Sequence, residues 1–178
     1  MYEAVLRFWF EEIPPQKWWV ADPSFDTEVR SRFGGLLVQA SLGELAEWRD
    51  EPQGRLAEIL VLDQFSRNVY RGTPQAFSQD PMALALSQEA LRARVQQLLS
   101  QIQMTFVLMP FMHSESRKIH EQAEALFREF SPRENFEFEL KHKAIVDRFG
   151  RYPHRNEVLG RTSTADELEF LKQPGSAF

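Results

Sequence analysis

The sequence predicts an all-α fold, a single domain over residues 1–178 that contains about nine helices. Apolar residues recur at helical spacing along the whole chain, whereas no run alternates apolar and polar residues as a half-buried strand does. Helix start signals precede several of these periodic segments. The length is ordinary for one domain, and no break in composition marks a second one.

Proline and capping residues place the starts of the expected helices. Asp22-Pro23 and Asp80-Pro81 each put a capping acid before a proline at the first helical position. Ser41–Glu44, Ser131–Glu134 and Thr164–Glu167 have the spacing of a capping box, in which a hydroxyl and a glutamate satisfy orphan backbone N–H groups. We therefore expect helices over residues 2–10, 23–40, 43–50, 53–69, 81–98, 101–109, 115–130, 133–149 and 164–172.

Two segments are apolar on every side, which is typical of helices buried in a core. In the expected helix over residues 53–69, the side chains that surround the axis are Ala57, Ile59, Leu60, Val61, Leu62 and Phe65. The segment Phe106–Met112 is equally apolar, and Pro110 should end or kink the helix there because it lacks a backbone N–H. Gly150 should end the helix over residues 133–149 in the left-handed conformation.

Composition and charge exclude several classes of protein. The absence of cysteine excludes disulfides, zinc-thiolate sites, iron–sulfur clusters and a cysteine nucleophile, and it fits a reducing cytoplasm. The net charge of -5 argues against nucleic-acid binding, and no stretch approaches the ~18 apolar residues of a membrane span. We expect a cytoplasmic protein without nucleic-acid partner, membrane contact, metal or cofactor, and the sequence leaves the oligomeric state open.

The first cluster of charged residues follows the most apolar helix and contains Asp63, Arg67, Asn68 and Arg71. Asp63 and Arg67 are four positions apart, so they can pair on one face of a helix. Because buried charges are costly unless they are paired, one interpretation is an internal ion pair that fixes the helix end and the turn at Gly72. The other interpretation is an anion or peptide site formed by Arg67, Asn68 and Arg71.

The second cluster is His113-Ser114-Glu115, between the apolar segment and the next expected helix. A histidine and a glutamate at a helix start could bind a metal or move protons. The simpler interpretation is a helix cap, with Ser114 as the capping residue and Glu115 at the positive end of the helix dipole. Two further histidines, His120 and His142, lie inside expected helices, where a lone histidine is usually a hydrogen-bonded packing residue.

The third cluster spans residues 147–161, where Gly150 and Pro153 shape the turns. Its basic residues are Arg148, Arg151, His154, Arg155 and Arg161, and Asn156 lies among them. Guanidinium forks suit carboxylate and phosphate groups, so this block is a candidate anion site. The alternative is a loop held in place by arginines that bond backbone carbonyls and pair with Asp147.

Three separated blocks resemble the bacterial family called domain of unknown function 924: Leu62–Asn68, Pro110–Glu115 and Arg148–Asn156. The segments Phe8–Phe10, Lys17–Trp19, Glu169–Leu171 and Pro174–Ser176 are also similar to it, so the resemblance covers essentially the whole chain. The family pattern usually has proline where this chain has Ser66. The resemblance implies an all-helical fold of the tetratricopeptide-like superfamily, an array of helical hairpins, and it supplies no reaction. The residues that match positions of the family pattern are Asp63, Arg67, Asn68, His113, Glu115, Arg151, His154, Arg155 and Asn156.

Two functions and one structural interpretation follow from these clusters. The leading hypothesis is a binding module, in which stacked helical pairs hold an anionic small molecule or an acidic peptide against the arginine-rich block. The alternative is a small hydrolase-like enzyme, with His113 or His154 as general acid or base, Glu115 or Asp63 orienting it, and arginines stabilising negative charge. This enzyme hypothesis requires the three clusters to meet in one pocket. In the structural interpretation, all three clusters only fix helix ends.

Overall fold

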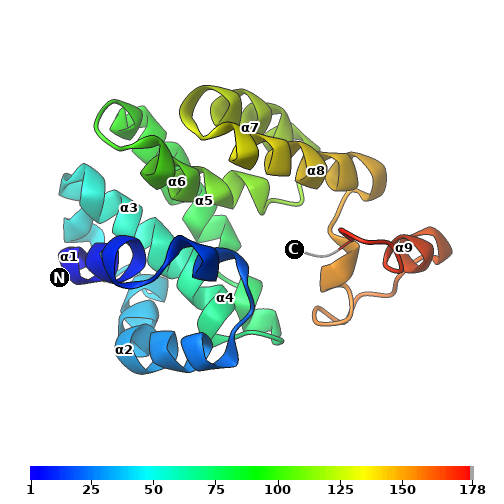
Figure 1. The fold of residues 1–178 in the computed structure, drawn as a ribbon, viewed down its shortest axis with the longest axis horizontal. Coiled ribbons are helices and arrows are strands. Elements are labelled where there is room, and N and C mark those ends of the chain that lie inside the picture. Colours follow the sequence, from blue (N-terminus) through cyan, green and yellow to red (C-terminus); the bar gives the residue numbers. More distant parts are fainter. Residues whose placement is uncertain (177–178) are drawn as a thin grey trace.

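The computed structural model describes residues 1–176 and contains only helices, turns and loops over that range, so the predicted all-α fold is confirmed (Figure 1). The α-helices are α1 (Tyr2–Arg7), α2 (Pro23–Ser41), α3 (Pro52–Leu60), α4 (Ser66–Val69), α5 (Asp80–Arg92), α6 (Gln101–Met112), α7 (Arg117–Phe130), α8 (Arg133–Phe149) and α9 (Ala165–Phe170). Shorter π-helical or 3₁₀ segments are η1 (Phe8–Glu12), η2 (Pro15–Trp19), η3 (Ala46–Asp50), η4 (Val61–Phe65), η5 (Pro74–Phe77), η6 (Val95–Gln97) and η7 (Pro153–Arg155). Over the same range, no helix combines the length and the hydropathy needed to cross a membrane.

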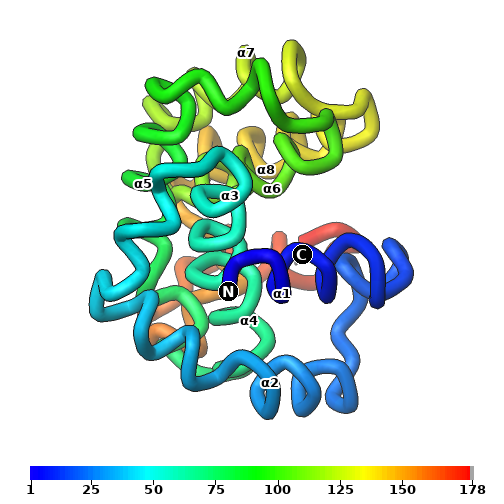
Figure 2. Tube along the Cα trace, turned by 90° about the vertical axis from the view of Figure 1, so that its left-hand side faces the viewer, coloured from blue at the N-terminus to red at the C-terminus, as the bar shows by residue number. Residues whose placement is uncertain are grey.

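The helices are arranged around α3, which contacts α1, α5 and α6. In both Figures 1 and 2, α7 lies at one end of the molecule and α2 at the opposite end. The helices α5, α6, α7 and α8 pack in chain order, each against the next, while α2 packs against α4 and η4. After α8 the chain turns away from this group and carries η7 and α9 (Figure 1). A tetratricopeptide-like arrangement of these helices stays a prediction.

One uninterrupted helical run from Pro52 to Val69 forms the centre of the protein, which confirms the predicted helix over residues 53–69. It consists of α3, the π-helical turn η4 and α4, and every residue from Leu56 to Leu62 is buried. The π-helical turn also places the polar side chains of Asp63 and Gln64 in the interior. Such turns interrupt the regular helical register and are frequent at functional sites.

Two of the predicted helix starts are confirmed, and a third is wrong in an informative way. Asp22 caps α2 by accepting hydrogen bonds from two backbone N–H groups, and Thr164 forms the expected capping box with Glu167 at α9. Asp80, by contrast, does not cap α5. It lies inside the first turn of this helix, and its carboxylate accepts hydrogen bonds from two arginine side chains.

Ser41 and Ser131 do not cap helices, contrary to the prediction. Each hydroxyl donates to a backbone carbonyl of the helix that precedes it, Ser41 to Val38 and Ser131 to Phe127. Serine readily makes such local bonds to the chain behind it, so its position near a helix start does not decide which helix it serves. The helix α8 therefore begins without a side-chain cap.

Two further helix bounds differ from the prediction because the backbone turns left-handed. The segment 43–50 is a turn at Gly43, where φ is 75°, followed by the 3₁₀ segment η3 in place of an α-helix. The helix α5 ends at Arg92 and not at residue 98, because Arg94 has a φ of 60°, which a right-handed helix cannot contain. Gly150, with a φ of 71°, ends α8 as predicted.

The helix α6 continues through Pro110 to Met112, so the predicted end at residue 109 is wrong. Proline removes one N–H from the helix, but Pro110 lies in the last turn, where the loss affects a single backbone hydrogen bond. The buried hydroxyl of Ser87 on α5 donates to the carbonyl of Val107, one turn before the proline. The longer helix makes His113 its C-terminal capping residue and thereby fixes where the second cluster lies.

Two glycines provide a test of this packing. A Cβ atom added at Gly54 would overlap the backbone carbonyl of Trp48, whereas one added at Gly35 on α2 would meet no atom within 4 Å. We expect Gly54→Ala to lower the free energy of unfolding by about 1–3 kcal/mol, as overpacking does. Gly35→Ala should raise it by about 0.5–1 kcal/mol, because alanine favours a helix more than glycine does. Urea unfolding measures both, and equal effects of the two variants would contradict the described packing.

Candidate functional site

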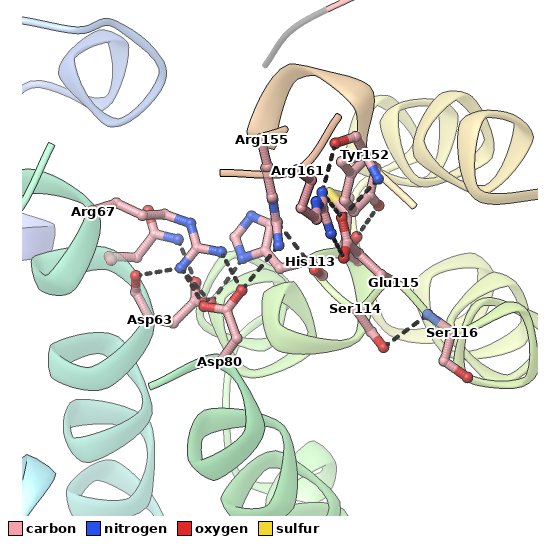
Figure 3. Close-up of polar contacts among 12 residues, drawn as sticks. Asp63, Arg67, Asp80, His113, Ser114, Glu115, Ser116, Tyr152, Arg155 and Arg161 are labelled. Carbon is pink, nitrogen blue, oxygen red and sulfur yellow. Dashed lines mark hydrogen bonds and ion pairs between the residues drawn. The ribbon is translucent and has the colours of Figure 1, made fainter. Parts of the chain in front are cut away.

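The three predicted clusters converge beside the C-terminal end of α6, as Figure 3 shows. Asp63 comes from η4, His113 caps α6, and Arg155 belongs to η7. A fourth group, Asp80 at the start of α5, lies between the guanidinium groups of Arg67 and Arg155. Segments from distant parts of the chain therefore form one charged network.

Arg67 pairs with two carboxylates at once. Its Nη1 lies 3.2 Å from Oδ1 of Asp63, and its two terminal nitrogens donate to Asp80 at 3.0 and 3.1 Å. Burial opposes the ionisation of Asp63, but Arg67 and then His113 overcome it and hold the pKa of the carboxyl well below its ordinary value. Burial also opposes the charge of Arg67, yet Asp63 and Asp80 raise its pKa. The internal ion pair predicted for Asp63 and Arg67 is thus present.

Asp63 also orients the ring of His113. The Nδ1 atom of His113 lies 2.7 Å from Oδ1 of Asp63, whose other oxygen accepts a hydrogen bond from Gln64 at 2.6 Å. An ionised carboxylate can only accept, so Nδ1 carries the proton of this hydrogen bond. Burial, and after it the charge of Arg67, lowers the pKa of His113. The imidazole is therefore neutral near pH 7, with its lone pair on Nε2.

Arg155 is a buried cation with few hydrogen-bond acceptors. Its Nη1 donates to Asp80 at 3.2 Å and its Nη2 donates to the backbone carbonyl of His113 at 3.0 Å. The guanidinium carbon lies 4.5 Å from the ring centroid of Phe77 and 4.7 Å from that of Tyr152. Its Nε is buried without a hydrogen-bond partner among residues 1–176. Burial, and then the charge of Arg67, lowers the pKa of Arg155.

An open pocket of about 380 Å³ lies over this network, and we call it the Arg155 pocket. Its polar lining residues are Ser78, Asp80, His113, Ser114, Glu115 and Arg155, and its apolar ones are Pro74, Phe77, Pro81, Leu84, Pro110 and Leu159. Two of the three predicted clusters therefore contribute to the lining, and the first cluster lies behind it through Asp63 and Arg67. The pocket offers one guanidinium, one imidazole and two carboxylates beside an apolar wall.

Glu115 joins the second cluster to the third and does not serve the start of α7. Its carboxylate accepts hydrogen bonds from Arg161 at 2.6 and 2.9 Å and from the backbone N–H of Tyr152 at 2.8 Å. Among residues 1–176, the hydroxyl of Ser114 accepts a hydrogen bond only from the N–H of Ser116, and α7 begins after Ser114 and Glu115. The helix-cap interpretation of this cluster is therefore wrong, because its acid is committed to the C-terminal segment.

Arg151 and Asn156 of the third cluster hold α9 in place. Arg151 donates to Glu167 at 2.6 and 2.8 Å, and the side chain of Asn156 donates to the same carboxylate at 3.3 Å. The ring of His154 lies 5.6 Å from that of Tyr152, outside the lining of the Arg155 pocket. These three candidates therefore do not line the pocket.

Two predicted contacts of the outer residues differ from the structure. Asp147 pairs with Lys143 at 2.6 Å, so its expected pairing with an arginine of the third cluster is wrong. Asn68 and Arg71 both bond Asp26 on α2, at 2.8 Å for the amide and 2.6 Å for the shortest guanidinium contact. They fasten α4 to α2, so the anion site expected from Arg67, Asn68 and Arg71 together is not formed.

Two residues of the network, Asp80 and Tyr152, are not among the candidates that the sequence suggests. Asp80 has the signature of a helix cap, and Tyr152 carries no charge. Arg161 belongs to the predicted third cluster, but its pairing with Glu115 does not follow from the sequence. Tyr152 is fully buried, and its hydroxyl donates to the backbone carbonyl of Met112 at the end of α6. No local signal distinguishes these residues, because each acts on a partner more than ten positions away.

A histidine and a glutamate form a buried hydrogen-bonded pair between α7 and α8. His120 Nδ1 lies 2.7 Å from Glu139 Oε1, and both side chains are completely buried. The other ring nitrogen of His120 donates to the carbonyl of Ser114 at 2.8 Å. Burial raises the pKa of Glu139, although the hydrogen bond from His120 works against this. Across the described range, no group of three His, Asp or Glu side chains is placed to hold a metal ion.

Comparisons with known proteins agree with this fold. Residues 5–175 match the family described as bacterial protein of unknown function (DUF924). The structure is similar to that of a protein of unknown function from Agrobacterium tumefaciens, with a TM-score of 0.91 and 33% sequence identity over 96% of each chain. No curated protein matches the chain.

Proposed function

The chain belongs to the bacterial family DUF924, and we propose that it binds a small anionic molecule in the Arg155 pocket. The incomplete hydrogen bonding of Arg155 carries this proposal. A guanidinium has five N–H donors, and only two of those of Arg155 donate to acceptors within residues 1–176. Nε is buried, so the N–H groups left for a ligand are those of Nη1 and Nη2, and a poorly paired donor gains by receiving an acceptor.

The neighbouring arginines show how unusual Arg155 is. Arg161 makes four hydrogen bonds, and Arg151 makes three. Both pair with a carboxylate through two nitrogens, whereas Arg155 reaches a single oxygen of Asp80, which Arg67 also binds. Arg155 is therefore the cation of this network whose charge is compensated least.

The size and lining of the pocket favour a small molecule over a peptide. Ligand pockets usually range from about 300 to 1,000 Å³, so a pocket of about 380 Å³ lies near the lower end. The rings of Phe77 and Tyr152 both pack against the guanidinium of Arg155, and a guanidinium held in this way suits a planar carboxylate. Pro81 and Leu84 provide an apolar wall for the carbon atoms of such a ligand.

The proposal predicts that Arg155 controls the binding of carboxylates. Small carboxylates and inorganic phosphate are screened by thermal shift, and the best ligand is measured by isothermal titration calorimetry. Arg155→Met should weaken its binding at least about tenfold, because a hydrogen bond to a charged group contributes about 1.5–3 kcal/mol. Arg155→Lys should recover only part of the loss, since lysine keeps the charge without the planar fork.

Arg71→Met is the matched control, because Arg71 also pairs with an aspartate but lies outside the pocket. It should bind the ligand with wild-type affinity. Circular dichroism verifies that each variant is folded. If none of the anions binds wild-type protein, or if Arg155→Met binds as tightly as wild type, the proposed function is wrong.

The enzyme alternative keeps the convergence of the three clusters and one pair of residues. The arrangement of Asp63 and His113 is that of a histidine oriented by a carboxylate, as a general base requires. Glu115, the other residue expected to orient a histidine, is bound to Arg161, and Arg151 is bound to Glu167. Binding is therefore the function that the geometry supports best.

A further inference from the structure

We infer that the anionic ligand is a short hydroxy acid, whose hydroxyl donates a hydrogen bond to Nε2 of His113 while its carboxylate binds Arg155. This inference rests on the proposed function and adds the chemical class of the ligand. It follows from two neighbouring groups of the Arg155 pocket, a cation with free donors and an imidazole with a free acceptor.

The acceptor character of Nε2 is set by Asp63. The hydrogen bond of 2.7 Å between Asp63 and Nδ1 requires the ring proton on Nδ1, because the buried aspartate is ionised. The ring of His113 is 15% exposed and His113 lines the pocket. Since Nδ1 is bonded to the buried aspartate, Nε2 is the ring nitrogen that is left for a ligand. No residue in the described range forms a hydrogen bond with this atom.

The two groups are close enough for one short ligand. Arg155 Nη2 donates to the backbone carbonyl of His113, the same residue whose ring supplies Nε2. Figure 3 shows the His113 ring next to the guanidinium of Arg155, with Asp80 below both. The carboxylate and the hydroxyl of the ligand must then be separated by only a few bonds. The carboxylates of Asp80 and Glu115, which also line the pocket, disfavour a second negative charge.

A purely structural role for the Asp63–His113 pair predicts something different. In that case the pair only fastens the end of α6 to η4, and ligand binding does not depend on the hydroxyl. The distinction is measurable with three acids of nearly equal size. Lactate carries a hydroxyl, propionate carries no polar group at that carbon, and pyruvate carries a carbonyl that can only accept a hydrogen bond.

The experiment compares the three acids by isothermal titration calorimetry at pH 7.5 on wild-type protein, His113→Phe and Arg155→Met. In wild type, lactate should bind at least about tenfold more tightly than propionate, and pyruvate no better than propionate, because its oxygen faces the lone pair of Nε2. His113→Phe keeps a ring in place without a nitrogen. It should bind all three acids with the affinity that wild type has for propionate. Arg155→Met should weaken all three acids together.

A second measurement tests the tautomer without any ligand. The proton–nitrogen correlation spectrum of the histidine rings should show His113 with a protonated Nδ1 and an unprotonated Nε2. A protonated Nε2, or pyruvate binding as tightly as lactate, overturns the inference and leaves the proposed function intact. Equal binding of lactate and propionate to wild type does the same. If Arg155→Met binds all three acids as tightly as wild type does, or if no acid binds wild type, the inference and the proposed function are both wrong.

Discussion

Glu139→Ala should lower the free energy of unfolding by about 3 kcal/mol, because it leaves a buried ring nitrogen without its hydrogen-bond partner and a cavity in the place of the side chain. Glu139 and His120 are both completely buried, and their hydrogen bond joins α8 to α7. Without the carboxyl group, Nδ1 of His120 has no partner in this buried site. Urea unfolding followed by circular dichroism measures the loss.

Glu139→Gln is the matched control and should lose less than about 1.5 kcal/mol, the contribution of one ordinary hydrogen bond. Nε2 of His120 must carry a proton, because it donates to the carbonyl of Ser114. In a neutral ring, Nδ1 then accepts, and the glutamine amide can donate to it in the place of the carboxyl group. If the alanine and glutamine variants lose the same free energy of unfolding, the hydrogen bond between Glu139 and His120 does not stabilise the fold, and the prediction is wrong.

Arg67→Met should also destabilise the fold by about 3–5 kcal/mol, and it should change the titration of a neighbour. Asp63 is completely buried and would keep only His113 and Gln64 as partners. The charge of Arg67 lowers the pKa of His113, so its removal should raise that pKa. Urea unfolding measures the first effect, and a pH titration of the His113 ring by nuclear magnetic resonance measures the second.

Arg71→Met provides the comparison, since Arg71 is 43% exposed and pairs with Asp26 at the surface. Exposed pairs contribute about 0.2–1 kcal/mol, so this variant should be nearly as stable as wild type and leave His113 unchanged. An Arg67→Met variant as stable as Arg71→Met would show that Asp63 needs no cation. A His113 pKa that does not rise would show that the network is not electrostatically coupled.

The features of the fold that follow from local chemistry were predictable from the sequence. The helical run from Pro52 to Val69 is visible because apolar residues surround its axis, and Gly150 ends α8 because glycine adopts the left-handed conformation easily. The bounds at Arg94 and Pro110 were missed for the opposite reason. There the tertiary structure imposes a conformation that the local sequence does not favour.

The candidate site was predictable in its residue types but not in its connections. The pairing of Asp63 with Arg67 follows from helical spacing, whereas the pairing of Asp80 with Arg155 joins residues 75 positions apart. A sequence shows which side chains carry charge, but only the packing of α5 against α6 and the return of the C-terminal segment decide which charges meet. This explains why Asp80 has the signature of a cap and yet holds two arginines.

The position of Arg155, 75 residues after Asp80, has a consequence for the newly made protein. A chain emerges from the ribosome from its N-terminus, and its early segments begin to fold first. Asp63, Arg67 and Asp80 can associate as soon as α5 has emerged, but Arg155 joins them only after these 75 residues, and Arg161 pairs with Glu115 later still. The carboxylate of Asp80 therefore has Arg67 as its first partner during synthesis and gains Arg155 only afterwards.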